Sequence, residues 1–214
     1  MPKPLIIFDC DGVLVDTEGL ANNRMAEIFT GLGFLISGHD CRTRFQGKSM
    51  TDVCGEISAI TKTKIDPISV QNEINRALKS NVKAVAGVEQ LVLDLAARGY
   101  PICVASSGSV DKMHTTLGQT KLLDLLKEVL FTASDVERGK PFPDVFEYAA
   151  QEMKADINTS IIIEDSLSGV IAGVSSGART FGYCGDPFTN KAALKNAGAE
   201  VFDYMSDMIS IIET

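Results

Sequence analysis

Tryptophan is absent from this 214-residue chain, and histidine occurs only as His39 and His114. The five cysteines are widely spaced and form no C-x-x-C pair, so the sequence has neither the ligands of a zinc site nor a disulfide framework. No apolar run is long enough to span a bilayer, and the N-terminal run is too short for a secretory signal. We therefore expect a cytoplasmic protein with reduced cysteines.

Positive charge is also scarce, because 20 basic residues against 28 acidic ones give a formal net charge of −8. A surface of this charge repels nucleic acid and anionic lipid. We therefore expect neither nucleic acid nor membrane as a partner, and we expect a monomer or a weak homo-oligomer. The hydrophobic fraction of 45%, in contrast, is that of a globular protein with a substantial core.

Short apolar runs recur along the chain, as is typical of strands buried on both faces of a parallel sheet. The runs cover residues 5–8, 102–105, 129–131 and 161–163, with weaker ones near 179–182 and 200–202. Segments of helical periodicity lie between them, and one of these places Leu167, Val170, Ile171 and Val174 on a single apolar face. The alternation predicts an α/β fold with a doubly wound, mostly parallel, Rossmann-like sheet.

The stretch from residue 17 to residue 85 does not follow this alternation, because it contains three helical faces and no convincing strand. We predict that residues 17–85 form a small all-helical cap, inserted after the first strand of an α/β core made of residues 1–16 and 86–214. Strand-less connections near residues 16–18 and 82–87 are its predicted hinges. An insertion at this place is expected over the carboxyl ends of the strands, where open α/β sheets bind ligands.

Polar residues follow the predicted strands at four places. The four segments are Asp9-Cys10-Asp11-Gly12, Ser106-Ser107, Gly139-Lys140-Pro141 and Glu164-Asp165-Ser166. Each segment alone is also what a turn or a helix cap looks like. Because the carboxyl ends of parallel strands converge on one crevice, the four together predict a single site.

The residue types in this predicted site suit phosphoryl transfer. A phosphate ester dianion repels an attacking carboxylate, so a divalent cation is needed, and Mg²⁺ suits ligation by Asp9 and Asp165. A carboxylate nucleophile such as Asp9 divides hydrolysis into two displacements through an acyl-phosphate, and Asp11 can protonate the leaving group and then activate water. Lys140 adds a fixed positive charge to this site.

Phosphate oxygens also need hydrogen-bond donors. Ser106 offers a hydroxyl group and Ser107 a backbone N–H at the end of the second run. The sequence therefore predicts that both serines bind phosphate together with Lys140.

The four segments closely resemble the motifs of the haloacid dehalogenase superfamily, in particular the subgroup of β-phosphoglucomutase and sugar-phosphate phosphatases with a helical cap. The resemblance covers essentially the whole chain. It implies Asp9 as nucleophile and magnesium ligand, and Asp11 as acid/base with its carbonyl on the metal. It further implies phosphate binding by Ser106 and Lys140. Asp165 is implied as a magnesium ligand, and Glu164 as a ligand or as its support.

Three positions separate the reactions of this superfamily. Asp11 counts against a dehalogenase and a phosphonatase, which resemble this chain but lack the second aspartate. Ala21 stands where the mutase has a hinge histidine, and Met50 near the place of its cap arginine. We predict a magnesium-dependent phosphatase that hydrolyses a small phosphorylated metabolite, a sugar or sugar-acid phosphate, through an aspartyl-phosphate. The alternatives are a hexose-phosphate mutase and a catalytically silent phospho-metabolite-binding protein.

Cap residues select the substrate in proteins of this kind. The resemblance and their basic or amide side chains make Gln46, Lys48, Arg42 and Arg44 candidates for substrate specificity. A basic cluster on an acidic protein can hold an acidic group or a second phosphate. The alternative is that the same residues form an ordinary solvated helix face.

Overall fold

A computed structural model describes residues 3–45 and 48–213 and divides the chain into two compact units. One unit combines the chain up to Asp16 with the chain from Lys83 onward, and the other runs from Thr17 to Val82. The second unit therefore ends before residue 85, where the sequence placed the boundary. The reason is strand β3 (Lys83–Ala84), which pairs antiparallel with β2 (Val15–Asp16) and so belongs to the first unit.

The same pairing corrects the prediction of strand-less hinges. The connections near residues 16–18 and 82–87 contain β2 and β3, which form a ribbon of two short strands. Val15 pairs with Ala84 and Asp16 with Lys83. The chain thus leaves and re-enters the first unit at neighbouring positions of one ribbon.

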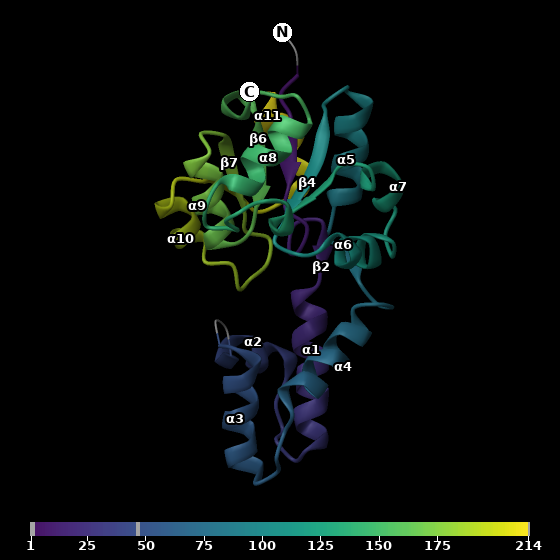
Figure 1. Cartoon of the computed structure of the whole chain (residues 1–214), viewed down its shortest axis with the longest axis vertical. Helices are drawn as coiled ribbons and strands as arrows, with labels where there is room; N and C mark the ends of the chain where they lie inside the picture. The colour runs from purple at the N-terminus through teal and green to yellow at the C-terminus, as the bar shows by residue number, and fades with distance from the viewer. Residues whose placement is uncertain (1–2, 46–47, 214) are drawn as a thin grey trace. The chain divides into compact units, whose positions relative to one another are not determined.

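The first unit is built on a six-stranded sheet in the order β5-β4-β1-β6-β7-β8. In Figure 1 its strands β4, β6 and β7 lie among the helices of this unit. Every neighbouring pair in the sheet is parallel. Its strands are β1 (Ile6–Phe8), β4 (Ile102–Ser106), β5 (Leu130–Thr132), β6 (Ile161–Glu164), β7 (Arg179–Tyr183) and β8 (Glu200–Phe202). The predicted α/β fold with a doubly wound parallel sheet is confirmed.

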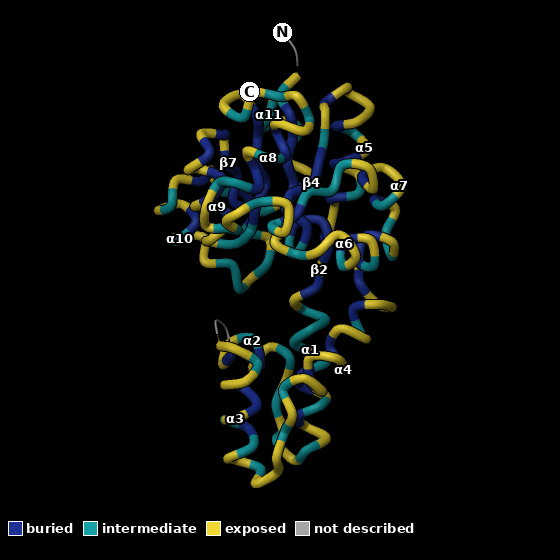
Figure 2. The backbone as a smooth tube through the Cα atoms, viewed as in Figure 1, coloured by how far each residue is buried: buried dark blue, intermediate teal, exposed yellow. Residues whose placement is uncertain are grey.

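The central strand β1 is fully buried, as are its neighbours β4 and β6 over most of their length (Figure 2). Leu5 and Ile7 pack in a cluster with Phe146 and Ala149 of helix α8 (Asp144–Glu152). Successive side chains of a strand point to opposite faces, so Ile6 and Phe8 fill the other side of the sheet. Apolar residues on both faces of β1 therefore hold the end of this strand at a fixed place.

Helices cover the sheet on both faces. Besides α8, the helices of this unit are α5 (Val88–Ala97), α6 (Val110–Leu117), α7 (Leu123–Leu126), α9 (Leu167–Ser175), α10 (Lys191–Asn196) and α11 (Met208–Ile212). Ser109 caps α6 and Ser166 caps α9 through their hydroxyl oxygens, which accept hydrogen bonds from backbone N–H groups one turn on. Both caps lie directly after the strands that carry the predicted site residues.

Helix α9 buries a different face from the one predicted. Leu167, Ile171 and Val174 are exposed, whereas Val170 is buried together with small residues of the helix. The reason is close packing: a side chain on Gly173 would lie 2.8 Å from Thr180 Oγ1 of strand β7. The glycines let the helix approach the sheet and turn its larger apolar residues outward.

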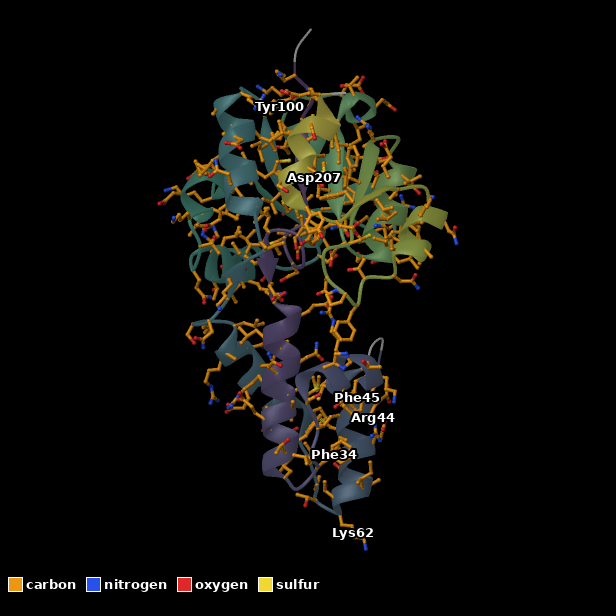
Figure 3. All side chains as sticks on the ribbon, turned by 180° about the vertical axis from the view of Figure 1, so that it is seen from behind. Phe34, Arg44, Phe45, Lys62, Tyr100 and Asp207 are labelled. Carbon is orange, nitrogen blue, oxygen red and sulfur yellow. The ribbon has the colours of Figure 1, made fainter. Side chains whose placement is uncertain are left out.

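The second unit is helical throughout its regular structure. Its helices are α1 (Glu18–Gly31), α2 (Gly38–Phe45), α3 (Met50–Thr61) and α4 (Pro67–Ala77). Helix α2 has no counterpart among the three predicted helical faces, because only Cys41 and Phe45 of its eight residues are buried. In Figure 3 the side chain of Arg44 lies with those of Phe34 and Phe45, and its guanidinium is 5.1 Å and 5.7 Å from their ring centroids. In the described part of the chain, no helix has the length and apolar character needed to cross a bilayer.

Candidate active site

Asp9 lies at the carboxyl end of β1 and is buried, with 6% of its surface exposed. Its backbone N–H donates to the carbonyl of Ile163 at 2.9 Å, which continues the pairing of β1 with β6. The chain then turns tightly: Gly12 adopts a φ of +83° and its N–H donates to Val15 O at 2.8 Å. A left-handed φ of this kind favours glycine, so the turn after Asp11 depends on Gly12.

Lys140 reaches Asp9 from a loop 131 residues further along the chain. Its Nζ donates to Asp9 Oδ1 at 2.5 Å, to Glu164 Oε1 at 2.7 Å and to the carbonyl of Ala105 at 3.1 Å. The side chains of Lys140, Asp9 and Glu164 are 3%, 9% and 1% exposed. Three segments predicted to converge therefore form one buried network of charged groups.

The charges of this network shift the pKa values of its members. Burial raises the pKa of Asp9 to about 7, against the opposing effect of Lys140 and with a further contribution from Glu164. Burial alone would lower the pKa of Lys140, but the two carboxylates beside it raise this pKa above its ordinary value. Lys140 therefore keeps its positive charge. Its attraction alone does not bring the pKa of Asp9 back to the ordinary value of an aspartate, because burial has the larger effect.

Both oxygens of the Glu164 carboxyl have partners inside the protein. Oε1 accepts from Lys140, and Oε2 accepts from the backbone N–H and the hydroxyl of Ser166 at 2.7 Å and 2.9 Å. The carboxyl fills the space beside Gly169, where any side chain would overlap it. This arrangement joins Lys140 to the start of helix α9 through the carboxyl group of Glu164.

Asp165 lies against the turn that follows Asp9. A methyl group on Gly12 would overlap Asp165 Oδ2, so the two residues are in direct proximity although they are far apart in sequence. Asp165 is partly exposed, in contrast to its neighbour Glu164, which is buried. The carboxyl group of Asp165 therefore lies next to Gly12, the last residue of the segment Asp9-Cys10-Asp11-Gly12.

Ser106 ends strand β4 and is 1% exposed. Its hydroxyl oxygen accepts from the backbone N–H of Gly108 at 3.0 Å. A methyl group on Gly108 would lie 3.5 Å from Ser106 Oγ and 3.6 Å from Asp11 Oδ2, so both groups border the same small space. Ser107, the other predicted phosphate-binding serine, is exposed beside it.

One charged residue of this site was not predicted. Lys112, on the first turn of α6, donates from Nζ to Asp11 Oδ2 at 2.7 Å. One feature of the sequence could have indicated this residue. Ser109 is a typical helix N-cap, so residue 112 falls on the first turn of the helix that follows the strand end at Ser106. The contact of its side chain with Asp11, however, joins residues 101 positions apart and leaves no local pattern in the sequence.

The proposed specificity residues belong to the helical unit and are held by acidic partners there. Arg42 donates to Glu18, and Arg44 and Lys48 both donate to Glu56. Gln46 lies outside the described residues. A cavity of about 280 Å³ in this unit is lined by Glu18, Ala21, Asn22, Met25, Arg42, Phe45, Lys48, Met50 and Val53. Two of the four candidates thus border one cavity together with Ala21 and Met50.

Comparisons with known proteins find relatives of both the sequence and the fold. The sequence model of haloacid dehalogenase-like hydrolases matches residues 6–183. A 6-phosphogluconate phosphatase from Escherichia coli is 28% identical over 85% of this chain and 83% of its own length. Hexitol phosphatase A from the same organism is 27% identical over 80% of this chain and 78% of its own length. A crystal structure of a hydrolase of this family from Deinococcus radiodurans, with bound phosphate and sodium, is 27% identical. It has a TM-score of 0.88 and covers 99% of this chain and 96% of that one.

Proposed function

Because this chain belongs to the haloacid dehalogenase-like hydrolases and is an enzyme of the phosphoric monoester hydrolase type, we propose a magnesium-dependent sugar-phosphate or sugar-acid phosphate phosphatase that works through an aspartyl-phosphate. The observation that carries the proposal is the buried contact of Lys140 with Asp9 at the end of the central strand. This contact joins a carboxylate to a permanent cation. Phosphoryl transfer through a covalent intermediate uses both groups, the carboxylate as nucleophile and the cation to stabilise the negative charge of the phosphate.

The proposed reaction has two displacements. First, a carboxylate oxygen of Asp9 bonds to phosphorus while the ester P–O bond breaks, and Asp11 gives its proton to the leaving alkoxide. Asp11, now a carboxylate, then takes a proton from a water molecule whose oxygen attacks the same phosphorus. The Asp9–phosphorus bond breaks, and inorganic phosphate leaves. Lys140, Ser106 and the N–H of Ser107 hold the phosphate oxygens through both steps.

The charges of the site fit a divalent cation. The carboxyl groups of Asp9 and Glu164 share the ammonium group of Lys140, and the carboxyl group of Asp165 lies beside the turn at Gly12 that follows Asp9. Among residues 3–45 and 48–213, no three side chains of His, Cys, Asp or Glu form a complete metal cage. Magnesium matches such a site because it takes one or two carboxylates, water molecules and substrate phosphate oxygens.

We propose that the carboxylates of Asp9 and Asp165 and the carbonyl of Asp11 hold the magnesium ion, with Glu164 as support rather than ligand. When bound, the ion supplies charge neutralisation between the nucleophile and the phosphate. It also compensates the burial that raises the pKa of Asp9. Asp9 is then ionised at neutral pH, as a nucleophile must be.

Replacement of Gly12 by alanine is expected to weaken magnesium binding, because the added methyl group would displace Asp165. The left-handed backbone adds a conformational cost of about 1–2 kcal/mol. Gly99→Ala is the matched control, since Gly99 has a φ of +77° and open space around it. Magnesium titration of activity, with thermal melts of both variants, separates strain from displacement. Equal magnesium responses in the two variants would contradict the placement of Asp165.

The helical unit is proposed to select the substrate. Arg42 and Lys48 border its cavity, and their basic side chains support binding of an acidic group of the substrate. The curated relatives named above act on a phosphorylated sugar acid and a hexitol phosphate, according to their names. Ala21 and Met50 in the same cavity offer no ionisable group, which argues against the mutase alternative.

A substrate panel tests the proposed function. We expect magnesium-dependent release of phosphate from p-nitrophenyl phosphate and, with higher kcat/KM, from sugar or sugar-acid phosphates, and we expect EDTA to abolish it. The phosphatase proposal is wrong if hexose 1-phosphate is isomerised with a bisphosphate primer while no ester is hydrolysed. Binding of phosphorylated sugars without any turnover would instead point to the silent binding protein.

A further inference from the structure

The ion pair of Lys112 and Asp11 lies beside the proposed chemistry, and the reaction outlined above assigns Lys112 no role. Lys112 Nζ donates to Asp11 Oδ2 at 2.7 Å across 101 residues of sequence. We propose that Lys112 is a positioning residue that holds the Asp11 carboxyl by Oδ2, so that Oδ1 exchanges the proton with the leaving group and with water. This inference rests on the proposed role of Asp11 as acid and base.

The fold fixes the backbone of Lys112 on both sides. Ser109 Oγ accepts from the backbone N–H of Lys112 at 3.3 Å, and the carbonyl of Lys112 accepts from Thr116 Oγ1 at 3.0 Å. Helix α6 thus begins at a defined residue and directs the lysine at position 112 back toward the end of strand β1. Such local anchoring reduces the number of conformations from which the ammonium group reaches Asp11.

Gly108 leaves the path between the two side chains open. A methyl group there would lie 3.4 Å from Lys112 Cδ and 3.6 Å from Asp11 Oδ2, which are ordinary contact distances. Position 108 therefore borders both side chains of the pair, and glycine keeps the space beside them free of a further side chain.

The exposure of the pair argues against a mainly structural purpose. The side chain of Lys112 is 41% exposed and that of Asp11 is 27% exposed. Ion pairs exposed to this degree contribute little to stability, because water screens the charges. Orientation of a catalytic group, in contrast, is sensitive to small displacements, and a shift of about 1 Å can change a rate by about 100-fold. Loss of Lys112 is thus expected to affect the reaction far more than the fold.

In the first displacement, proton transfer by Asp11 matters only for some leaving groups. An alkoxide leaving from a sugar phosphate is strongly basic and takes a proton as the P–O bond breaks. The p-nitrophenolate ion is a weak base and leaves without one. The first displacement, which determines kcat/KM when it is the first irreversible step, therefore depends on Asp11 for alkyl phosphates and much less for aryl phosphates.

The test compares Lys112→Met with the wild-type enzyme on p-nitrophenyl phosphate, a neutral sugar phosphate and a sugar-acid phosphate. We expect kcat/KM for both sugar substrates to fall by about 100-fold and for the aryl substrate by less than about threefold. The loss should lie in kcat rather than in KM, and Lys112→Arg should restore part of it. Lys127→Met, which removes a lysine of 47% exposure outside the site, is the matched control.

Several outcomes would overturn the inference. A loss equal for all three substrates, together with a lower melting temperature, would make Lys112 a structural residue. A loss confined to the KM of the sugar-acid phosphate would make it an anchor for the substrate's acidic group. Failure of the wild-type enzyme to hydrolyse any ester would refute the proposed function and this role with it. Normal wild-type turnover with unchanged ratios in Lys112→Met would refute only the role of Lys112.

Discussion

Asp9→Asn is expected to lower kcat for every phosphate ester by at least about 10⁴-fold, because an amide cannot take the place of the nucleophilic carboxylate. The fold should persist, since the amide has the shape of the carboxyl group and its oxygen can still accept from Lys140. Steady-state and single-turnover assays measure the loss of activity, and circular dichroism melts check that the variant is folded. Asp124→Asn, at a side chain of 96% exposure, serves as the control.

The size of the loss is what makes this variant informative. A residual activity of more than a few per cent in Asp9→Asn, after exclusion of deamidation back to aspartate by mass spectrometry, would mean that another group attacks phosphorus. Asp11 is the nearest alternative in sequence, but it contacts Lys112, whereas Asp9 contacts Lys140.

Lys140→Met is expected to have the largest effect on stability, with a loss of about 3–5 kcal/mol in the free energy of unfolding. The methionine would leave Asp9 and Glu164, both nearly inaccessible to water, without the cation that they share. Urea unfolding in EDTA measures this loss, because magnesium could otherwise replace part of the missing charge. The same variant should also lack measurable turnover.

A second substitution tests the cause of that instability. Glu164→Gln in the Lys140→Met background removes one of the two uncompensated charges and should restore part of the lost free energy of unfolding. Lys127→Met, at an exposed lysine, should change stability by less than about 1 kcal/mol. Additive losses in the Lys140 and Glu164 double variant would contradict a shared network.

Most strands of the sheet could be predicted because strands that are buried on both faces appear in the sequence as continuous apolar runs. Residues 161–163 were predicted as a strand and β6 covers Ile161–Glu164. The two-residue strands β2 and β3 were missed, since a pattern of alternation needs more residues than they contain. Helix α2 was missed because its apolar residues are too few to define a face.

The site residues could be predicted by type and order, but their contacts could not. The sequence shows that Glu164 follows a strand, yet its pairing with Lys140 and Ser166 depends on the space left by Gly169. The contact of Lys112 with Asp11 was missed because it joins side chains 101 residues apart in the sequence. Glycines at close contacts also explain why α9 buries small residues rather than its predicted apolar face.

The raised pKa of Asp9 is linked to the proposed need of the site for a cation. Burial raises the pKa of Asp9, and Lys140 alone does not offset this effect. A divalent ion bound beside Asp9 would lower this pKa and make the carboxylate available as a nucleophile at neutral pH. The buried charges that cost stability in the absence of the ion are thus the same groups that the proposed reaction uses.

Trapping of the covalent intermediate determines whether Asp9 is the nucleophile. The enzyme is mixed with a reactive phosphate ester and magnesium, quenched in acid and treated with borohydride, which reduces an acyl-phosphate to an alcohol. Peptide mass spectrometry should then find residue 9 converted from aspartate to homoserine, with residue 11 unchanged. Conversion at another residue, or no conversion while the enzyme turns over under the same conditions, would contradict an aspartyl-phosphate at Asp9.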